Sequence, residues 1–198
     1  MGSPAVQGPQ EDGPVRNAVF LDRDGTINRE VNYLSTAGKL KVFKSSVEGL
    51  RLLKEEGYLL VVITNQSGVA RGMFDEKTVD TLNAELNRRV GFLIDAFVCC
   101  THHPDFTGTC DCRKPSPGML LSAAKTHGID LKRSWMVGDK VSDIEAGVRA
   151  GCKTALVLTG YGRKEREKLA AKKIIPDIIA GNLASFARKV KMGWPGTT

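Results

Sequence analysis

The chain has 198 residues, 41% of them hydrophobic, and a formal net charge of +7, which suits one ordinary domain with a sizeable core. No apolar run is long enough to cross a bilayer and no signal-peptide core is present, so we expect a cytoplasmic protein without a membrane partner. Five cysteines, an odd number, argue against the disulfide framework of a secreted protein.

The two ends of the chain differ in composition from the middle. Residues 1–15 are rich in Gly, Pro and polar residues, and we expect them to form a disordered leader before a single domain at residues 16–192. Much of the positive charge lies in residues 162–173 and 186–194, which read as solvated helix faces. We therefore expect no nucleic-acid partner, since a basic balance also suits small phosphorylated substrates. We also expect a monomer.

Short, continuous apolar runs predict strands that are buried on both faces. Helical patterns with N-cap and stop residues lie between these runs. Strands that alternate with helices indicate a Rossmann-like three-layer α/β/α fold with a mainly parallel sheet. The runs lie at residues 18–22, 59–65, 96–100, 134–139 and 154–160, and the predicted helices are Ser46 to Glu56, Asp75 to Val90, Ser116-Pro117 to Gly128 and Ser142 to Ala150, with an edge strand and a closing helix in residues 176–190.

The first strand ends in "DRDGT", with two carboxylates two positions apart. In an extended segment the side chains of Asp22 and Asp24 point to the same side, while Arg23 points elsewhere. Two carboxylates held together repel each other, so the pair needs a cation, and Mg²⁺ prefers such oxygen ligands. An exposed acidic turn is the alternative explanation of this stretch taken alone.

Three other predicted strands also end in polar residues. Thr64 and Asn65 close the second, Arg113 and Lys114 follow the third at some distance, and Asp139 closes the fourth. Ligands of a parallel sheet bind beyond the carboxyl ends of its strands. We therefore expect these side chains to converge on one site.

This set of motifs resembles that of the haloacid-dehalogenase-like phosphohydrolases over roughly residues 17–160. The resemblance implies that Asp22 attacks phosphorus and that Asp24 protonates the leaving oxygen and later activates water. It implies that Thr64 and Lys114 bind the phosphoryl group. It also implies that Mg²⁺ is held by the Asp22 carboxylate, the Asp24 backbone carbonyl and Asp139, while we expect Asp143 to orient Lys114 or a metal-bound water.

The stretch "CCTHHPDFTGTCDCRKP" contains two closely spaced pairs of metal ligands. Cys100 with His102, and Cys110 with Cys112, suit a tetrahedral structural Zn²⁺ site, although the spacing is not the usual C-x-x-C. A disulfide or unrelated thiols are the alternatives. A zinc-loop subgroup of the same superfamily ends its loop in a similar "CDCRKP".

Too few residues follow the first and second strands for a large cap domain, so loops must shape the pocket. Within the zinc-loop subgroup, "TNQSGVARG" and "VGDK" are most similar to the heptose 1,7-bisphosphate 7-phosphatases, which implies a small phosphorylated sugar as substrate. Histidinol-phosphate phosphatases, polynucleotide 3′-phosphatases and a non-catalytic zinc-stabilised module are the alternatives. Such an enzyme removes one of two phosphates, and Arg113 is the expected anchor for the phosphate that stays on the sugar. The predicted substrate contacts are Arg23, Glu30, Val31, Asn32, Tyr33, Asn65, Gln66, Ser67, Arg71, Arg113 and Lys140.

Overall fold

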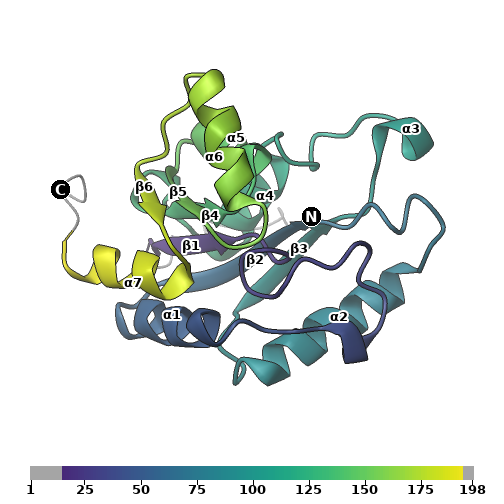
Figure 1. Cartoon of the computed structure of the whole chain (residues 1–198), viewed down its shortest axis with the longest axis horizontal. Coiled ribbons are helices and arrows are strands. Elements are labelled where there is room, and N and C mark those ends of the chain that lie inside the picture. Colours follow the sequence, from purple (N-terminus) through teal and green to yellow (C-terminus); the bar gives the residue numbers. More distant parts are fainter. Residues whose placement is uncertain (1–14, 194–198) are drawn as a thin grey trace, which may run out of the picture.

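The computed structural model describes residues 15–193, so the leader expected at residues 1–15 lies, apart from its last residue, outside the described part of the chain. The elements alternate along the chain as predicted (Figure 1). They are β1 (Ala18–Leu21), η1 (Ala37–Lys39), α1 (Lys44–Glu55), β2 (Leu59–Asn65), α2 (Glu76–Arg89), β3 (Ala96–Cys100), α3 (Pro104–Thr107), α4 (Gly118–His127), η2 (Leu131–Arg133), β4 (Trp135–Gly138), α5 (Val141–Ala150), β5 (Lys153–Val157), α6 (Gly162–Ala171), β6 (Ile178–Ala180) and α7 (Leu183–Lys191).

The six strands form one sheet in the order β3-β2-β1-β4-β5-β6, and every neighbouring pair is parallel. From β1 the chain adds β2 and β3 on one side, then crosses back to add β4, β5 and β6 on the other side of β1. The strand order therefore reverses between β1 and β4. In open parallel sheets, ligands bind beyond the carboxyl ends of the strands at this point. The ends of β1 and β4 are therefore where the fold creates a crevice.

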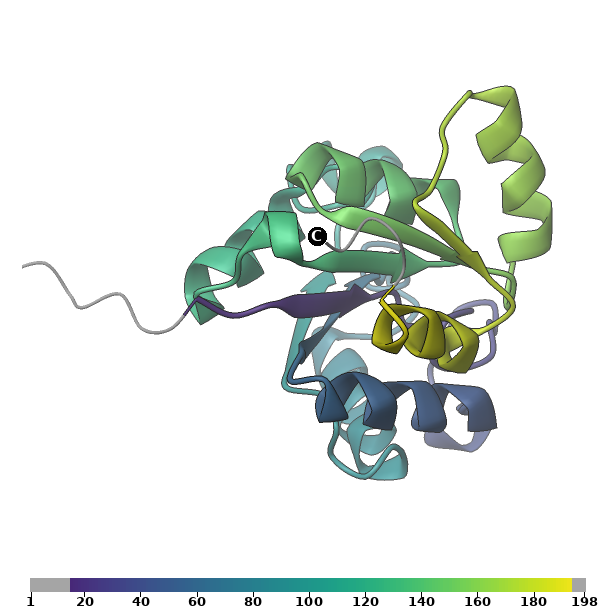
Figure 2. The ribbon, with the colours of Figure 1, turned by 90° about the vertical axis from the view of Figure 1, so that its left-hand side faces the viewer.

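Helices cover both faces of the sheet (Figure 2). One face, with Val19 and Leu21 of β1, packs against α1, α2 and α7. The other face, with Ala18 and Phe20, packs against α4 and α5, and α6 closes this layer through Leu169 against β5 and α5. The predicted three-layer α/β/α class is thus confirmed. The runs lack polar alternation because both faces of each central strand are buried.

Most predicted elements are present, and the differences lie at their ends. Asp75 caps α2 by accepting a hydrogen bond from the Thr78 N–H, as expected. The prediction of Ser116 as the N-cap of α4 is wrong, because the helix begins at Gly118 with Pro117 as its cap residue. The Gly118 N–H donates instead to the Asp111 carbonyl, so the cysteine-rich loop sets the start of this helix.

The segments after β1 and β2 are short, as the sequence predicts. Residues 22–43 contain only the single turn η1, and residues 66–75 contain no helix or strand. In this part of the chain no separate domain covers the crevice, so loops form its walls. Within residues 15–193, no helix combines the length and apolar character that crossing a membrane requires.

Candidate active site

Asp22 leaves β1 at the carboxyl edge of the sheet, and Lys114 reaches it from the loop between β3 and α4. Lys114 Nζ donates to Asp22 Oδ1 at 2.8 Å and to the Ile63 carbonyl oxygen at 2.7 Å. It also lies 2.7 Å from Oδ1 of Asp143. Two of the three N–H donors of this ammonium group are thus hydrogen-bonded, and the ion pair with Asp143 adds a third close contact. Its position beside the Asp22 carboxylate is therefore fixed.

Both members of this buried pair stay charged. Burial by itself raises the pKa of Asp22, but the ammonium groups of Lys114 and Lys140 outweigh it and bring that pKa below its usual value. Burial by itself lowers the pKa of Lys114, but the charges of Asp143 and Asp22 bring it above its usual value. Asp22 is therefore an anionic carboxylate, which is the state that a nucleophile requires.

Asp139 follows β4 and is completely buried. Its Oδ2 accepts a hydrogen bond from the Tyr161 N–H at 2.7 Å, while its Oδ1 has no protein partner. Burial and the negative charges of Asp22 and Asp143 raise the pKa of Asp139 to about 8. The carboxylates of these three residues each offer an oxygen, all within 4.8 Å of one another. This unpartnered oxygen among three carboxylates fits a hard divalent cation.

Asp24 lies at the edge of the same crevice with its carboxylate held by neighbours. Its Oδ2 accepts hydrogen bonds from Arg23 Nε and Nη2 and from Gln66 Nε2, and its Oδ1 accepts one from Asn28 Nδ2. The side chain is 14% exposed. Asp24 is therefore oriented and still accessible, as a proton-transferring group must be.

The end of β2 contributes a hydroxyl and two amides. Thr64 Oγ1 accepts a hydrogen bond from Gln66 Nε2 at 2.9 Å. The Asn65 side chain makes two bonds of 3.1 Å with the backbone of Lys114, one to its carbonyl oxygen and one from its N–H. Asn65 thus ties the end of β2 to the segment that carries Lys114.

A cavity of about 170 Å³ lies between these segments, and its lining includes Asp22, Asp24, Thr64, Lys114 and Asp143. Most of the residues expected to contact substrate line it, namely residues 30–33, Asn65, Gln66, Ser67 and Lys140. Lys140 Nζ lies 2.9 Å from Glu30 Oε2, so an ion pair connects the end of β4 to the loop after β1. The cavity also has walls that the sequence did not predict, namely Leu34, Gly68, Phe74 and Ser142.

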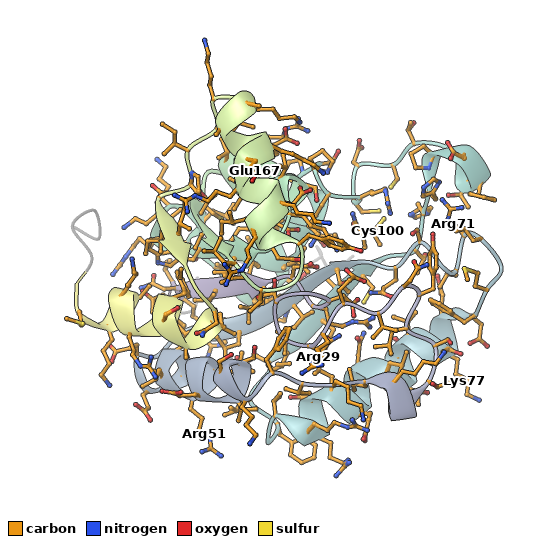
Figure 3. The ribbon with its side chains drawn as sticks, viewed as in Figure 1. Arg29, Arg51, Arg71, Lys77, Cys100 and Glu167 are labelled. Carbon is orange, nitrogen blue, oxygen red and sulfur yellow. The ribbon has the colours of Figure 1, made fainter. Side chains whose placement is uncertain are left out.

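Three predicted substrate contacts do not line this cavity. Arg23 is 1% exposed and points away from it, toward α2. Arg71 lies beside α3 (Figure 3), 4.7 Å above the Phe106 ring, with Nη2 3.2 Å from His103 Nε2. Arg113 Nη1 donates to the His102 carbonyl oxygen at 3.1 Å. Spacing identifies which arginines are near the site, but not which neighbour each guanidinium selects.

The four predicted zinc ligands lie together beyond the end of β3. The separations among their ligand atoms are 3.1 Å for Cys100–Cys112, 3.2 Å for Cys110–Cys112, 3.7 Å for Cys100–Cys110, and 3.3 and 3.8 Å from His102 Nδ1 to Cys112 and Cys100. Tetrahedral Zn²⁺ with bonds of about 2.3 Å to sulfur places two sulfur atoms about 3.8 Å apart. The sulfur–sulfur separations in the cluster are at or below this value, so the four side chains lie close enough together to bind one metal ion.

The same stretch of sequence contains two other possible metal ligands, Cys99 and His103, and both have other partners. Cys99 Sγ accepts a hydrogen bond from Asn83 Nδ2 at 3.3 Å, and His103 caps α3 through Nδ1. All five cysteines are free thiols, so the disulfide alternative is not realised. Burial and hydrogen bonds with the neighbouring thiols raise the pKa of Cys112 to about 12, which is consistent with a cluster that needs a cation to become thiolate.

Comparison with known proteins agrees with this geometry. Residues 111–186 match the HAD-hydrolase-like family. A D-glycero-beta-D-manno-heptose-1,7-bisphosphate 7-phosphatase of Yersinia pestis is 39% identical over 183 residues, which cover 88% of this chain and 95% of that protein. The corresponding protein of Pasteurella multocida is 43% identical over 173 residues, which cover 83% and 94% of the two chains.

A solved structure is similar as well. The D,D-heptose 1,7-bisphosphate phosphatase of B. bronchiseptica, crystallised with magnesium and phosphate, superimposes with a TM-score of 0.79 at 32% identity. The superposition covers 89% of this chain and 98% of that one. With relatives this similar over most of its length, the chain belongs to the haloacid-dehalogenase-like hydrolases and, within them, to the family of these heptose bisphosphate phosphatases.

Proposed function

We propose that the protein is a magnesium-dependent phosphatase that removes the C7 phosphate of D-glycero-D-manno-heptose 1,7-bisphosphate and leaves heptose 1-phosphate, the form a nucleotidyltransferase can activate. The observation that carries this proposal is the buried Asp22–Lys114 pair beside Asp139 at the base of the cavity. The names of relatives at 39–43% identity support the choice of substrate.

The reaction would proceed in two in-line displacements. In the first, an Asp22 carboxylate oxygen attacks phosphorus, and the bond from phosphorus to the C7 oxygen breaks with its electron pair on that oxygen. Asp24 gives this oxygen its proton. In the second, water attacks the aspartyl-phosphate and passes a proton to Asp24, and the bond to Asp22 breaks to release phosphate. Lys114 and Thr64 are placed to stabilise the negative charge on the phosphoryl oxygens.

Magnesium would be held by the carboxylates of Asp22 and Asp139 and by the Asp24 carbonyl oxygen, with Asp143 nearby. The unpartnered Oδ1 of Asp139 supports this ligand set. When bound, the ion supplies positive charge to the phosphoryl group. Asp143 would act mainly by holding Lys114, which it contacts at 2.7 Å.

We further propose that Zn²⁺ occupies the Cys100, His102, Cys110 and Cys112 cluster and has a structural role. Cys112, the last residue of the cluster, precedes Lys114 by two residues. A metal there would therefore stabilise the loop that positions the Lys114 ammonium group. Free thiols of this kind persist in a reducing compartment, which supports a cytoplasmic location.

The cations that line the cavity are Lys114 and Lys140, and Arg113 is adjacent in sequence to the first. We propose that Arg113 and Lys140 bind the phosphate retained at C1.

A monomer without nucleic acid is part of the proposal, since one chain supplies all the groups of the site. Several cations of the basic C-terminal helices have acidic partners: Lys172 with Glu145, Arg188 with Glu48 and Lys191 with Glu55.

A phosphate-release panel tests the substrate. It compares the α and β anomers of heptose 1,7-bisphosphate with fructose 1,6-bisphosphate, histidinol phosphate and a 3′-phosphorylated oligonucleotide. One heptose bisphosphate is expected to have the highest kcat/KM. Both anomers are needed because relatives at about the same identity carry the alpha and the beta name. A higher kcat/KM for histidinol phosphate or the oligonucleotide would overturn the substrate, and turnover by Asp22→Asn would overturn the covalent mechanism.

A further inference from the structure

The carboxylate of Asp24 is held asymmetrically. Its Oδ2 accepts three hydrogen bonds, two of them from the Arg23 guanidinium at 3.1 and 2.8 Å and one from Gln66 at 3.0 Å. Its Oδ1 accepts one, from Asn28 at 2.8 Å. A carboxylate oxygen has two lone pairs, so Oδ1 is the atom that keeps room for a proton. The orientation of Asp24 thus depends mostly on what fixes Arg23.

Arg23 is fixed by a residue of α2 that no motif includes. Arg23 Nη1 donates to Asn83 Oδ1 at 3.0 Å, and Asn83 is 4% exposed. The guanidinium has no acceptor, so the amide oxygen of Asn83 must face it. The amide nitrogen then faces β3 and donates to Cys99 Sγ at 3.3 Å. Asn83 is held at both ends, and a chain of buried and partly buried hydrogen bonds runs from β3 through α2 to Asp24.

We propose that Asn83 is a positioning residue for the phosphatase reaction. By accepting from Nη1 it fixes the plane of the Arg23 guanidinium, and Nε and Nη2 of Arg23 then hold Oδ2 of Asp24. This leaves Oδ1 directed to the oxygen that leaves the substrate. Without Asn83, Gln66 and Asn28 still contact Asp24, but the guanidinium can rotate to another acceptor. The inference rests on the proposed function, because it concerns proton transfer to a leaving group.

The test compares two substrates that differ in their need for that proton. Heptose 1,7-bisphosphate loses an alkoxide, which must be protonated, whereas p-nitrophenyl phosphate loses a phenolate, which need not be. General acid–base transfer contributes about 10²–10⁴-fold. Both substrates share the second displacement, in which Asp24 accepts a proton from water, so the comparison uses kcat/KM, which reports the first displacement alone. In Asn83→Leu, kcat/KM for the bisphosphate is therefore expected to fall about tenfold or more. For p-nitrophenyl phosphate, kcat/KM is expected to fall less than about threefold. Asn83→Asp keeps an acceptor for Arg23 and is expected to retain the wild-type ratio of the kcat/KM values for the two substrates.

Asn87→Leu is the matched control. Asn87 lies one turn further along α2 and also makes two side-chain hydrogen bonds, both to the backbone of Ile94. Its loss disturbs the same helix without reaching Asp24. A ratio that changes equally in the Asn83 and Asn87 variants, or in neither, overturns the inference. If Asn83→Leu does not fold, Asn83→Ser, whose side chain is too short to reach Arg23, takes its place with the same expectation. Absence of wild-type activity on both substrates would instead refute the proposed function.

Discussion

The ammonium nitrogen of Lys114 lies 2.8 Å from Oδ1 of Asp22, a residue 92 positions earlier in the chain. The parallel sheet brings them together, because Asp22 directly follows β1 and Lys114 lies in the segment between β3 and α4, with only β2 between these two strands. Neither charge is tolerated alone in a buried site. The proposed nucleophile and the cation proposed to stabilise the transferred phosphoryl group therefore also maintain each other's charge.

Replacing Lys114 by Met is expected to lower kcat by at least about 10²-fold, because the phosphoryl oxygens lose a fixed donor. Asp22 and Asp143 lose their buried partner as well, so the free energy of unfolding should decrease by about 3–5 kcal/mol. The control is Lys54→Met, which breaks a partly exposed ion pair with Asp95. That change should cost no more than about 1 kcal/mol and leave kcat unchanged. Steady-state kinetics and urea unfolding measure both effects, and equal losses of kcat in the two variants would contradict the prediction.

Two glycines give a test of how closely Asp139 is packed. A Cβ added at Gly25 would lie 2.2 Å from Asp139 Oδ2, whereas one added at Gly57 would have no atom within 4 Å. Both have a positive φ, +94° and +80°, so this backbone conformation alone should cost each Ala variant about 1 kcal/mol of unfolding free energy, to which Gly25→Ala adds the clash. Only Gly25→Ala should displace Asp139, the proposed metal ligand, with a fall in kcat of about 10²-fold and weaker Mg²⁺ binding by calorimetry. Unchanged Mg²⁺ affinity in Gly25→Ala would argue against Asp139 as a ligand.

The affinity for Mg²⁺ should depend on pH. The pKa of Asp139 rises from its usual 3.8 to about 8 in the folded protein without metal. Between these values the folded state binds more protons than the unfolded state, so this residue makes the metal-free protein less stable as pH rises. A metal ion must displace that proton. Mg²⁺ is therefore expected to bind at least about tenfold more tightly at about pH 8.5 than at about pH 6.5. Titration calorimetry at both values measures the difference, which Asp139→Asn should abolish.

The cysteine cluster should contain about one zinc ion per chain, by metal analysis of the purified protein. Cys112→Ala is expected to lose the zinc and to lower both the melting temperature and kcat, because the Arg113-Lys114 segment loses its support. The control is Cys152→Ala, which removes a buried thiol packed in the core next to α4 and α5. It should lower the melting temperature and keep the zinc. Full zinc content in a Cys100→Ala/His102→Ala double variant would show that other residues bind the metal.

The sequence predicts the site well where the position of a residue along a strand determines its place in space. Asp22, Thr64 and Asp139 end buried apolar runs, and parallel strands bring such ends to one edge of the sheet. Asn83 illustrates the opposite case. It is one polar residue within a helix, and its contact with Arg23 arises only from the packing of α2 against the sheet. The helix pattern contains no signal for that contact.

The arginines show a second reason why sequence is insufficient. A guanidinium at the end of a long side chain selects among the acceptors that tertiary structure provides. The loop places the His102 carbonyl 3.1 Å from Arg113 Nη1, and Arg23 selects Asp24 and Asn83. The walls formed by Leu34 and Phe74 come from loops without a regular period. The shortness of these segments predicts that loops shape the pocket, but not which of their side chains face it.

Selectivity for the bisphosphate provides the last prediction. If Arg113 binds the retained phosphate, its guanidinium must exchange the His102 carbonyl for that phosphate, a stronger, charge-assisted partner. Arg113→Ala should then raise KM for heptose 1,7-bisphosphate about tenfold or more while kcat falls less, since a contact remote from the reacting bond contributes mainly to binding. Heptose 7-phosphate lacks the C1 phosphate, so its kinetics should hardly change. Lys140→Ala is the comparison, because Lys140 lines the cavity and also lowers the pKa of Asp22, and it should slow both substrates. A loss of preference for the bisphosphate in Lys140→Ala but not in Arg113→Ala would assign the anchor to Lys140 alone.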